Sequence, residues 1–205
     1  LVELNGLKGW DVSNGRCFRS MFRGCGALKD INGLKHWNVS SGEDFRCMFD
    51  QCNSLKNLSA LENWNVCKGK DFYAMFDRCY SLTDLDGLKR WDVSNGTDFI
   101  NMFYGCYSIK NVDGLYGWNV RNGENFSEMF YNCYSLTDLD QLKRWKVHNG
   151  NNFTYMFKGC SSLEDIKGLE NWNTKNAKDM KEMFDGCDKL NDKESLRINE
   201  KFPSN

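Results

Sequence analysis

Hydrophobic residues recur along this chain with a period of 27 residues, and no insertion interrupts the period. Copies of one pattern begin at Leu1, Leu28, Leu55, Leu82, Ile109, Leu136 and Leu163, and an eighth begins at Leu190 and soon loses the pattern. A fixed period in this range is typical of a solenoid, in which each repeat is one coil packed on its neighbours. The pattern predicts a seven-repeat array over residues 1–189, followed by a partial repeat that forms a C-terminal cap and tail over residues 190–205.

Two hydrophobic rhythms follow one another within each repeat, and the copy from Leu82 to Ser108 shows both. The first places a leucine at every third position from Leu82 to Leu88, a spacing typical of the short strand in leucine-rich repeats. The second has the spacing i, i+3, i+4, i+7 from Phe99 to Cys106 and predicts a helix of about two turns. Asn95-Gly96 predicts a turn between them, and Thr97 or Asp98 can cap the helix.

These rhythms predict a fold class. We expect a right-handed α/β solenoid like that of leucine-rich-repeat proteins, with seven coils that each hold one short parallel strand and one short helix. A single coil buries too little apolar surface to offset the entropy of ordering its chain, so the coils must stack to be stable.

Tryptophan recurs at one position of every repeat. The seven members are Trp10, Trp37, Trp64, Trp91, Trp118, Trp145 and Trp172. Such regular recurrence favours a spine inside the core over a platform for carbohydrate.

Seven of the ten cysteines also share one position, at the end of the second rhythm. They are Cys25, Cys52, Cys79, Cys106, Cys133, Cys160 and Cys187. A column of small parallel side chains that face the core is a packing ladder, because a buried free cysteine behaves as a small hydrophobe. We therefore expect reduced structural thiols rather than a disulfide scaffold, and Cys17, Cys47 and Cys67 lie off this ladder.

The chain shows no feature of an enzyme or a cofactor-binding protein. It has no catalytic triad, HExxH motif, phosphate-binding loop or dinucleotide fingerprint, and no CxxC or CxxH pair that would suggest zinc. The net charge is −1, so no global field favours nucleic acid. No apolar run approaches the length of a membrane span. The chain starts on a repeat-position leucine, so we expect residue 1 to lie within or just before a longer array.

Tyrosines occupy two variable positions in the central repeats. Tyr80, Tyr107 and Tyr134 follow the ladder cysteine in three successive repeats, and Tyr104 and Tyr131 follow the second phenylalanine in two of them. Both sets fall outside the apolar stripe, so we expect surface columns with about 5 Å between coils. The columns either stack for stability alone or form a contact surface, because tyrosine is enriched at binding hot spots.

Polar positions of the first rhythm become acidic in the central repeats, and we expect them to face the inner surface of the solenoid. The acidic set is Asp84, Asp86, Asp113, Asp138 and Asp140. Stacked carboxylates repel one another unless a cation or a basic partner shares them. Without EF-hand or RTX spacing, a basic protein partner or plain solubility is favoured over Ca²⁺. The two tyrosine columns and the acidic set form the candidate partner-binding site.

Charged residues of the second rhythm differ in sign between repeats without a regular pattern. Examples are Arg23, Asp50 and Asp77, which share one repeat position. Charges of mixed sign that do not form a run indicate a solvated face.

One string carries a resemblance to a known family. W-[DN]-V-S-N-G-x-D-F-x-x-M-F-x-x-C-x-S-L-x-x-L-x-G-L is followed from Trp91 to Leu115, with Ile109 and Val112 at two of its leucine positions. It resembles the repeats of BspA-like leucine-rich-repeat surface proteins, which also occur in mycoplasma-type lipoproteins, and the resemblance covers essentially the whole chain. The family commonly has Val at the position of Gly96 and Met at that of Phe99.

The resemblance implies a bacterial or protist surface protein that binds host proteins or neighbouring cells, with no catalytic residues and no cofactor. The partner is then a protein or glycoprotein, with a basic surface if the aspartates take part. The alternative is an intracellular or secreted effector that scaffolds host proteins. Ten thiols are unusual in an oxidising setting, so they indicate a reducing or anaerobic one.

Overall fold

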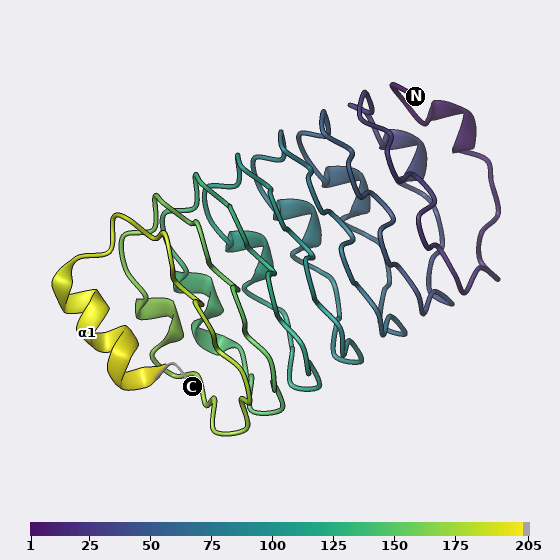
Figure 1. The fold of residues 1–205 in the computed structure, drawn as a ribbon. Coiled ribbons are helices and arrows are strands. Elements are labelled where there is room, and N and C mark those ends of the chain that lie inside the picture. Colours follow the sequence, from purple (N-terminus) through teal and green to yellow (C-terminus); the bar gives the residue numbers. More distant parts are fainter. Residues whose placement is uncertain (203–205) are drawn as a thin grey trace.

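The computed structural model describes residues 1–202 of the chain as an elongated stack of coils (Figure 1). Each 27-residue repeat contains one 3₁₀ helix, and one α-helix follows the last coil. The elements are η1 (Asn5–Leu7), η2 (Asn32–Leu34), η3 (Ser59–Leu61), η4 (Asp86–Leu88), η5 (Asp113–Leu115), η6 (Asp140–Arg144), η7 (Lys167–Leu169) and α1 (Asp192–Lys201).

The first rhythm forms a 3₁₀ helix, so the strand predicted there is wrong. In the fourth repeat η4 follows a turn in which the Asp84 carboxylate accepts a hydrogen bond from the Asp86 N–H at 3.3 Å. Leu82, Leu85 and Leu88 are all buried. A 3₁₀ helix has three residues per turn, so leucines at every third position lie on one side of it.

The second rhythm forms a series of turns, so the predicted helix is also wrong. The N–H groups of Phe99, Asn101, Phe103 and Gly105 donate to carbonyls of the next coil at 2.7–3.1 Å. Asn101 and Gly105 have left-handed backbone conformations, with φ of 56° and 65°. Every second N–H therefore points along the stack, where it cannot form the i to i−4 bond of an α-helix.

Strand pairing is reduced to isolated parallel bridges within residues 1–202. One bridge joins Glu3 and Asp30, and the others run down one column that comprises Cys17, Asp44, Asp71, Asp98, Asn125, Asn152 and Asp179. The Asp98 carboxylate accepts a hydrogen bond from the Ile100 N–H at 3.0 Å. Asp98, which we expected to cap a helix, therefore closes an Asx turn instead.

The tryptophans form a stacked spine. From Trp37 to Trp172 each indole lies 6.1–6.4 Å from the next, measured between ring centroids, and each is at least 96% buried. Each of these indole N–H groups donates to the carbonyl of a leucine 30 residues earlier, at 2.9–3.2 Å. Trp10 departs from the prediction because its side chain is 59% exposed; its coil has a neighbour on one side only.

The ladder cysteines bond to the coil before them. From Cys52 to Cys187 each thiol lies 3.2–3.3 Å from the carbonyl oxygen of a phenylalanine 30 residues earlier. These six are buried, whereas Cys25 is half-buried. Because each thiol already has an acceptor across the coil interface, the ladder joins coils through S–H···O contacts as well as packing.

The glycine of the Asn-Gly turn is required by an aromatic ring rather than by its backbone angle. A Cβ atom on Gly96 would lie 2.5 Å from the Cζ atom of Phe99. The turn itself closes through the Gly96 N–H and the Val93 carbonyl at 2.8 Å. A larger residue would displace the phenylalanine ring, which explains why glycine and phenylalanine recur together here.

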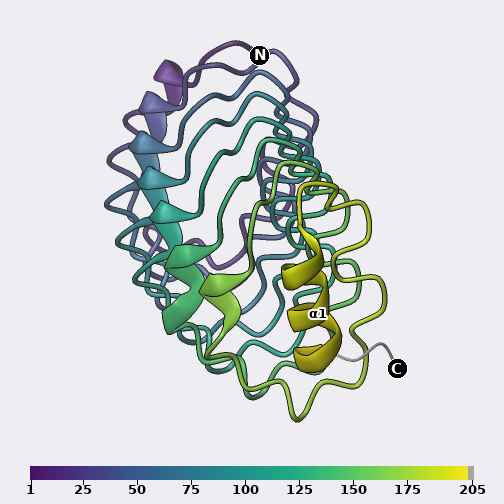
Figure 2. The ribbon, with the colours of Figure 1, turned by 90° about the vertical axis from the view of Figure 1, so that its left-hand side faces the viewer.

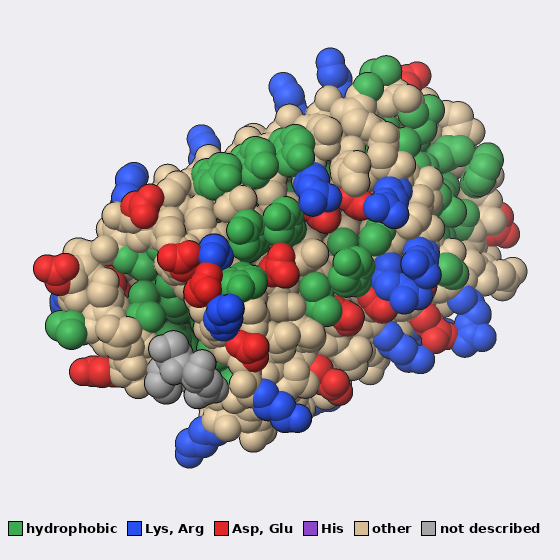
Figure 3. Space-filling view, viewed as in Figure 1, with side chains coloured by type: hydrophobic (Ala, Val, Ile, Leu, Met, Phe, Trp, Pro, Cys, Tyr) green, Lys and Arg blue, Asp and Glu red, His purple; other side chains and the backbone are tan. Residues whose placement is uncertain are grey.

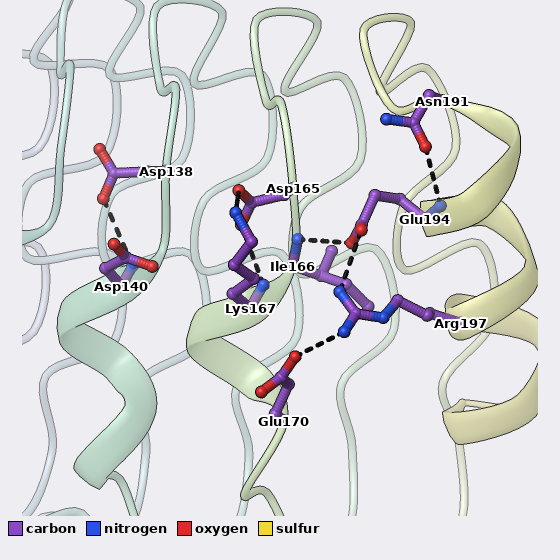
Figure 4. A network of polar contacts seen from close by, with 9 residues as sticks. All are labelled: Asp138, Asp140, Asp165, Ile166, Lys167, Glu170, Asn191, Glu194 and Arg197. Carbon is purple, nitrogen blue, oxygen red and sulfur yellow. Dashed lines mark hydrogen bonds and ion pairs between the residues drawn. The ribbon is translucent and has the colours of Figure 1, made fainter.

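Helix α1 covers part of the last coil (Figure 4). The Asn191 side chain caps α1 by accepting the Glu194 N–H at 3.1 Å. The buried Glu194 carboxylate accepts the Ile166 N–H at 3.1 Å, and Arg197 bridges Glu194 and Glu170 at 3.0 and 2.8 Å. The polar cap predicted from the sequence thus includes a helix, and the end of its predicted tail, residues 203–205, lies outside the described residues.

The 3₁₀ helices line one side of the stack (Figure 2). The segments that correspond to residues 98–107 line the other side, and we call that side the turn face. The two long sides of the molecule therefore carry different repeat positions.

Candidate protein-binding surface

Three tyrosines stack along the turn face. Tyr80, Tyr107 and Tyr134 form what we call the first tyrosine column, with ring centroids 4.7 and 4.8 Å apart. The side chains of Tyr107 and Tyr134 are 37% and 42% exposed. Figure 3 shows such a row of hydrophobic side chains along one edge of this face, with a second group below it.

A shorter stack lies beside the first. Tyr104 and Tyr131 form the second tyrosine column, with ring centroids 4.8 Å apart and planes within 10° of each other. Tyr155 meets the edge of Tyr131 at 6.4 Å. Sequence reasoning missed Tyr155 because it occupies a different repeat position and no tyrosine repeats at that position.

Arg78 stands at one end of the second column. Its guanidinium lies over the ring of Tyr104, 5.3 Å from the centroid, and its side chain is 41% exposed. Its backbone is left-handed, with φ of 55°. The Arg78 side chain also approaches the first column: a Cβ atom on Gly105 would lie 3.6–3.7 Å from Arg78 Cγ and from ring carbons of Tyr107 and Tyr80.

Two aspartates that sequence reasoning placed on a solvated face are buried. Asp50 and Asp77 are 2% and 6% exposed, and each has one carboxylate oxygen with no hydrogen-bond partner within residues 1–202. Arg23 pairs with Asp50 at 2.7 Å, and Arg78 lies 3.6 Å from Asp77. Burial raises the pKa of Asp77 to about 7; Arg78 opposes this rise and Asp50 adds to it.

The acidic set lies elsewhere and is partly occupied. Asp138 is half-buried, and its carboxylate accepts the Asp140 N–H at the start of η6 (Figure 4). Burial raises the pKa of Asp138. Asp86 pairs with Lys89 at 2.9 Å. Within residues 1–202, the structure gives no contact between Asp84, Asp86, Asp113, Asp138 or Asp140 and either tyrosine column, so the two halves of the predicted site do not form one cluster.

The described part of the chain offers little for other chemistry. No group of three or more His, Cys, Asp or Glu side chains within residues 1–202 could hold a metal ion. Burial raises the pKa of the Cys52 and Cys187 thiols to about 12. Of the three off-ladder cysteines, Cys17 is exposed, Cys67 is half-buried and Cys47 is buried. In the same range no helix is long and apolar enough to cross a membrane.

Comparisons with known proteins agree on a repeat fold. A family model described as "Mycoplasma protein of unknown function, DUF285" matches residues 2–112, 57–164 and 110–199. The crystal structure of a leucine-rich-repeat protein from T. pallidum aligns with a TM-score of 0.51 and 16% identity, over 98% of this chain and 76% of that one. At this identity the likeness shows the fold alone, a leucine-rich-repeat solenoid.

A further solved structure is a leucine-rich cell surface protein from Faecalibacterium prausnitzii A2-165. It aligns at 15% identity and a TM-score of 0.31, over 84% of this chain and 61% of that one. No curated protein matches the chain.

Proposed function

We propose that this chain is a non-catalytic protein-binding module. It belongs to the family described as "Mycoplasma protein of unknown function, DUF285", and its fold is that of leucine-rich-repeat proteins. Repeat solenoids keep a fixed core and place specificity on surface positions that differ between coils. In line with the BspA-like repeats that the sequence resembles, we place the module on a bacterial or protist surface, where it binds a protein or glycoprotein of a host or neighbouring cell.

The two tyrosine columns are the observation that carries this proposal. The tryptophan spine and the phenylalanine stacks run through the array, so the fold itself needs them. The tyrosine columns occur in the third to fifth repeats only, and other repeats form the same coil with Asn53 or Ser161 at the first-column position. Rigid, partly exposed aromatic side chains are what binding hot spots use.

The acidic set does not determine the charge of a partner that binds the tyrosines. A basic partner was expected because the aspartates were taken to lie beside the tyrosines. The structure separates the two sets, so the tyrosine surface is proposed as the binding site without the acidic set.

The test compares tyrosines that are equally exposed. Tyr107 and Tyr116 are both 37% exposed, but Tyr116 lies outside the two columns and stacks on Arg144. The double variant Tyr107→Ala, Tyr134→Ala should lose about 1–2 kcal/mol of binding free energy, or roughly 5- to 30-fold in affinity. The loss is measured as saturable binding of the purified chain to intact host or neighbouring cells, and to proteins released from the surface of those cells.

Tyr116→Ala is the control and should bind like the unaltered chain. If the double variant binds normally, the columns are a structural stack and the proposed binding site is wrong.

A further inference from the structure

We propose that Arg78 and the two tyrosine columns form a docking site for an acidic polypeptide segment, whose carboxylates meet the Arg78 guanidinium and the edges and hydroxyl groups of the stacked tyrosines. This inference rests on the proposed function and specifies the chemistry of the partner. Four observations lead to it.

The first observation is the backbone of Arg78. The equivalent residues of the seven repeats are Gly24, Gln51, Arg78, Gly105, Asn132, Gly159 and Gly186, and all have positive φ. Glycine adopts this conformation without strain, whereas a long side chain there costs on the order of 1 kcal/mol. Arginine thus occupies a position where four of the seven repeats have glycine, so the coil itself does not require its side chain.

The second observation is that the charge of Arg78 is available. Its ion pair with Asp77 is long, at 3.6 Å, and its side chain remains 41% exposed. The nearby Asp50 is already paired with Arg23 at 2.7 Å. Burial raises the pKa of Asp77 to about 7, so this partner of Arg78 is only partly ionised at neutral pH. Arg78 therefore keeps positive charge and free N–H groups for an incoming carboxylate.

The third observation is which parts of the tyrosines are accessible. Both faces of Tyr107 are covered, by Tyr80 at 4.7 Å and by Tyr134 at 4.8 Å. Tyr104 is likewise held between Arg78 and Tyr131. Within the columns, Tyr107 and Tyr104 therefore present ring edges and hydroxyl groups rather than open ring faces. Aromatic edges are electropositive, and phenol hydroxyls donate hydrogen bonds, so both suit carboxylates.

The fourth observation is a set of lysines at one repeat position, one of which follows a tyrosine of the first column. Lys29, Lys56 and Lys110 share one repeat position, three residues after the first-column position, and all are exposed. None of them forms an ion pair within residues 1–202. Figure 3 shows Lys and Arg side chains that project along the edge above the row of hydrophobic side chains. Lys110 therefore adds positive charge three residues after Tyr107, whereas Thr83 and Thr137 occupy this position after Tyr80 and Tyr134.

The experiment measures binding of fluorescently labelled oligoglutamate and oligolysine peptides to the whole chain by anisotropy at low salt. We expect oligoglutamate to bind and oligolysine not to, and added salt should weaken the binding because part of the contact is exposed. Arg78→Gly should bind oligoglutamate about tenfold more weakly, through the loss of charge-assisted hydrogen bonds.

The variant is chosen so that folding does not confuse the result. Glycine is the residue found at this position in four of the seven repeats, so the backbone is preserved. The matched control Arg121→Ala removes an exposed arginine from a different repeat position and should bind like the unaltered chain. Equal binding of the two peptides, or unchanged binding by Arg78→Gly, would overturn the inference.

The same variants separate this inference from the proposed function. If Tyr107→Ala, Tyr134→Ala loses cell binding while Arg78→Gly keeps it in full, the tyrosine surface is the binding site but its partner does not dock an acidic segment on Arg78. If both variants lose cell binding and oligoglutamate competes with it, both proposals stand.

Discussion

The molecule contains two kinds of aromatic stack, one inside the coils and one on the turn face. The buried phenylalanines repeat at 5.4–5.7 Å between ring centroids, coil after coil. The tyrosines stack more closely, at 4.7–4.8 Å, but in the third to fifth repeats only. A stack that every coil shares serves the fold, whereas one that a few coils carry is free to serve binding.

The inner aromatic side chains also include the tryptophan spine, which is hydrogen-bonded as well as stacked. Each buried indole from Trp37 onward donates to a carbonyl of the preceding coil. The tyrosines are held mainly by one another and by Arg78. Removing an inner aromatic should therefore cost more stability than removing an outer one.

The largest effect should come from Trp118→Ala. This change leaves a large cavity and removes one of the two hydrogen bonds that the Leu88 carbonyl accepts, the other being that of the Trp91 N–H, so we expect a loss of about 3–5 kcal/mol in the free energy of unfolding. Denaturant titration measures it. Trp10→Ala is the matched control, because Trp10 is 59% exposed, and it should cost less than about 1 kcal/mol. If the two variants lose similar amounts of free energy of unfolding, burial of the tryptophan spine does not stabilise the fold as described.

The next effect concerns Asp77, a buried carboxyl group next to Arg78. Its pKa is about 7 in the folded chain against 3.8 ordinarily, so the folded state binds the proton more tightly. Protonated Asp77 therefore stabilises the fold below about pH 4. As the pH rises toward 7 this contribution is lost, and the free energy of unfolding should fall by roughly 2–4 kcal/mol. Asp77→Asn should remove this pH dependence of the free energy of unfolding, measured over the same pH range.

Asp188→Asn, at an exposed position, is the control and should leave the pH dependence in place. If Asp77→Asn keeps the full pH dependence, another group is responsible for it.

A smaller effect is expected at the cysteine ladder. The Cys106 thiol lies 3.2 Å from the Phe76 carbonyl in an apolar site, so Cys106→Ser should lower the free energy of unfolding by about 1–2 kcal/mol. Cys67→Ser, at a half-buried position off the ladder, should change it little. Mass measurement after alkylation of the unfolded, unreduced chain should count ten free thiols. Disulfides within the ladder would show that it does not serve as reduced packing.

The smallest change in stability should be that of Arg78→Gly. Glycine relieves the left-handed strain, while the contact with Tyr104 is lost, so the two effects of about 1 kcal/mol each nearly cancel. Thermal unfolding should therefore shift little in either direction. A large loss of stability would mean that Arg78 is retained for the fold rather than for binding.

The columns were predictable from the sequence, but the backbone that carries them was not. Recurrence every 27 residues identifies Trp118 and Cys106 as members of buried columns without any knowledge of the coil's path. By contrast, leucines at every third position suit both a leucine-rich-repeat strand and a 3₁₀ helix. The spacing from Phe99 to Cys106 suits both a helix and a row of turns. The choice depends on hydrogen bonds to the next coil, which no local pattern contains.

The candidate site was predictable only in part, for a related reason. The tyrosine columns follow from repetition, so Tyr80, Tyr107 and Tyr134 could be placed together. Asp77 could not be recognised as buried, because its repeat position holds Arg23, Tyr104 and Lys158 in other coils. The aspartates of the first rhythm were assigned to an inner surface of strands, and they lie instead at the starts of 3₁₀ helices.

The most direct test of the distinction between the two stacks is the free energy of unfolding of a triple variant, Tyr80→Ala, Tyr107→Ala, Tyr134→Ala. Two exposed ring pairs are lost, so we expect a cost of about 1–2 kcal/mol, well below that of the single change Trp118→Ala. A triple variant that loses as much stability as Trp118→Ala would show that the tyrosines belong to the fold, and the account of a dedicated binding surface would be wrong.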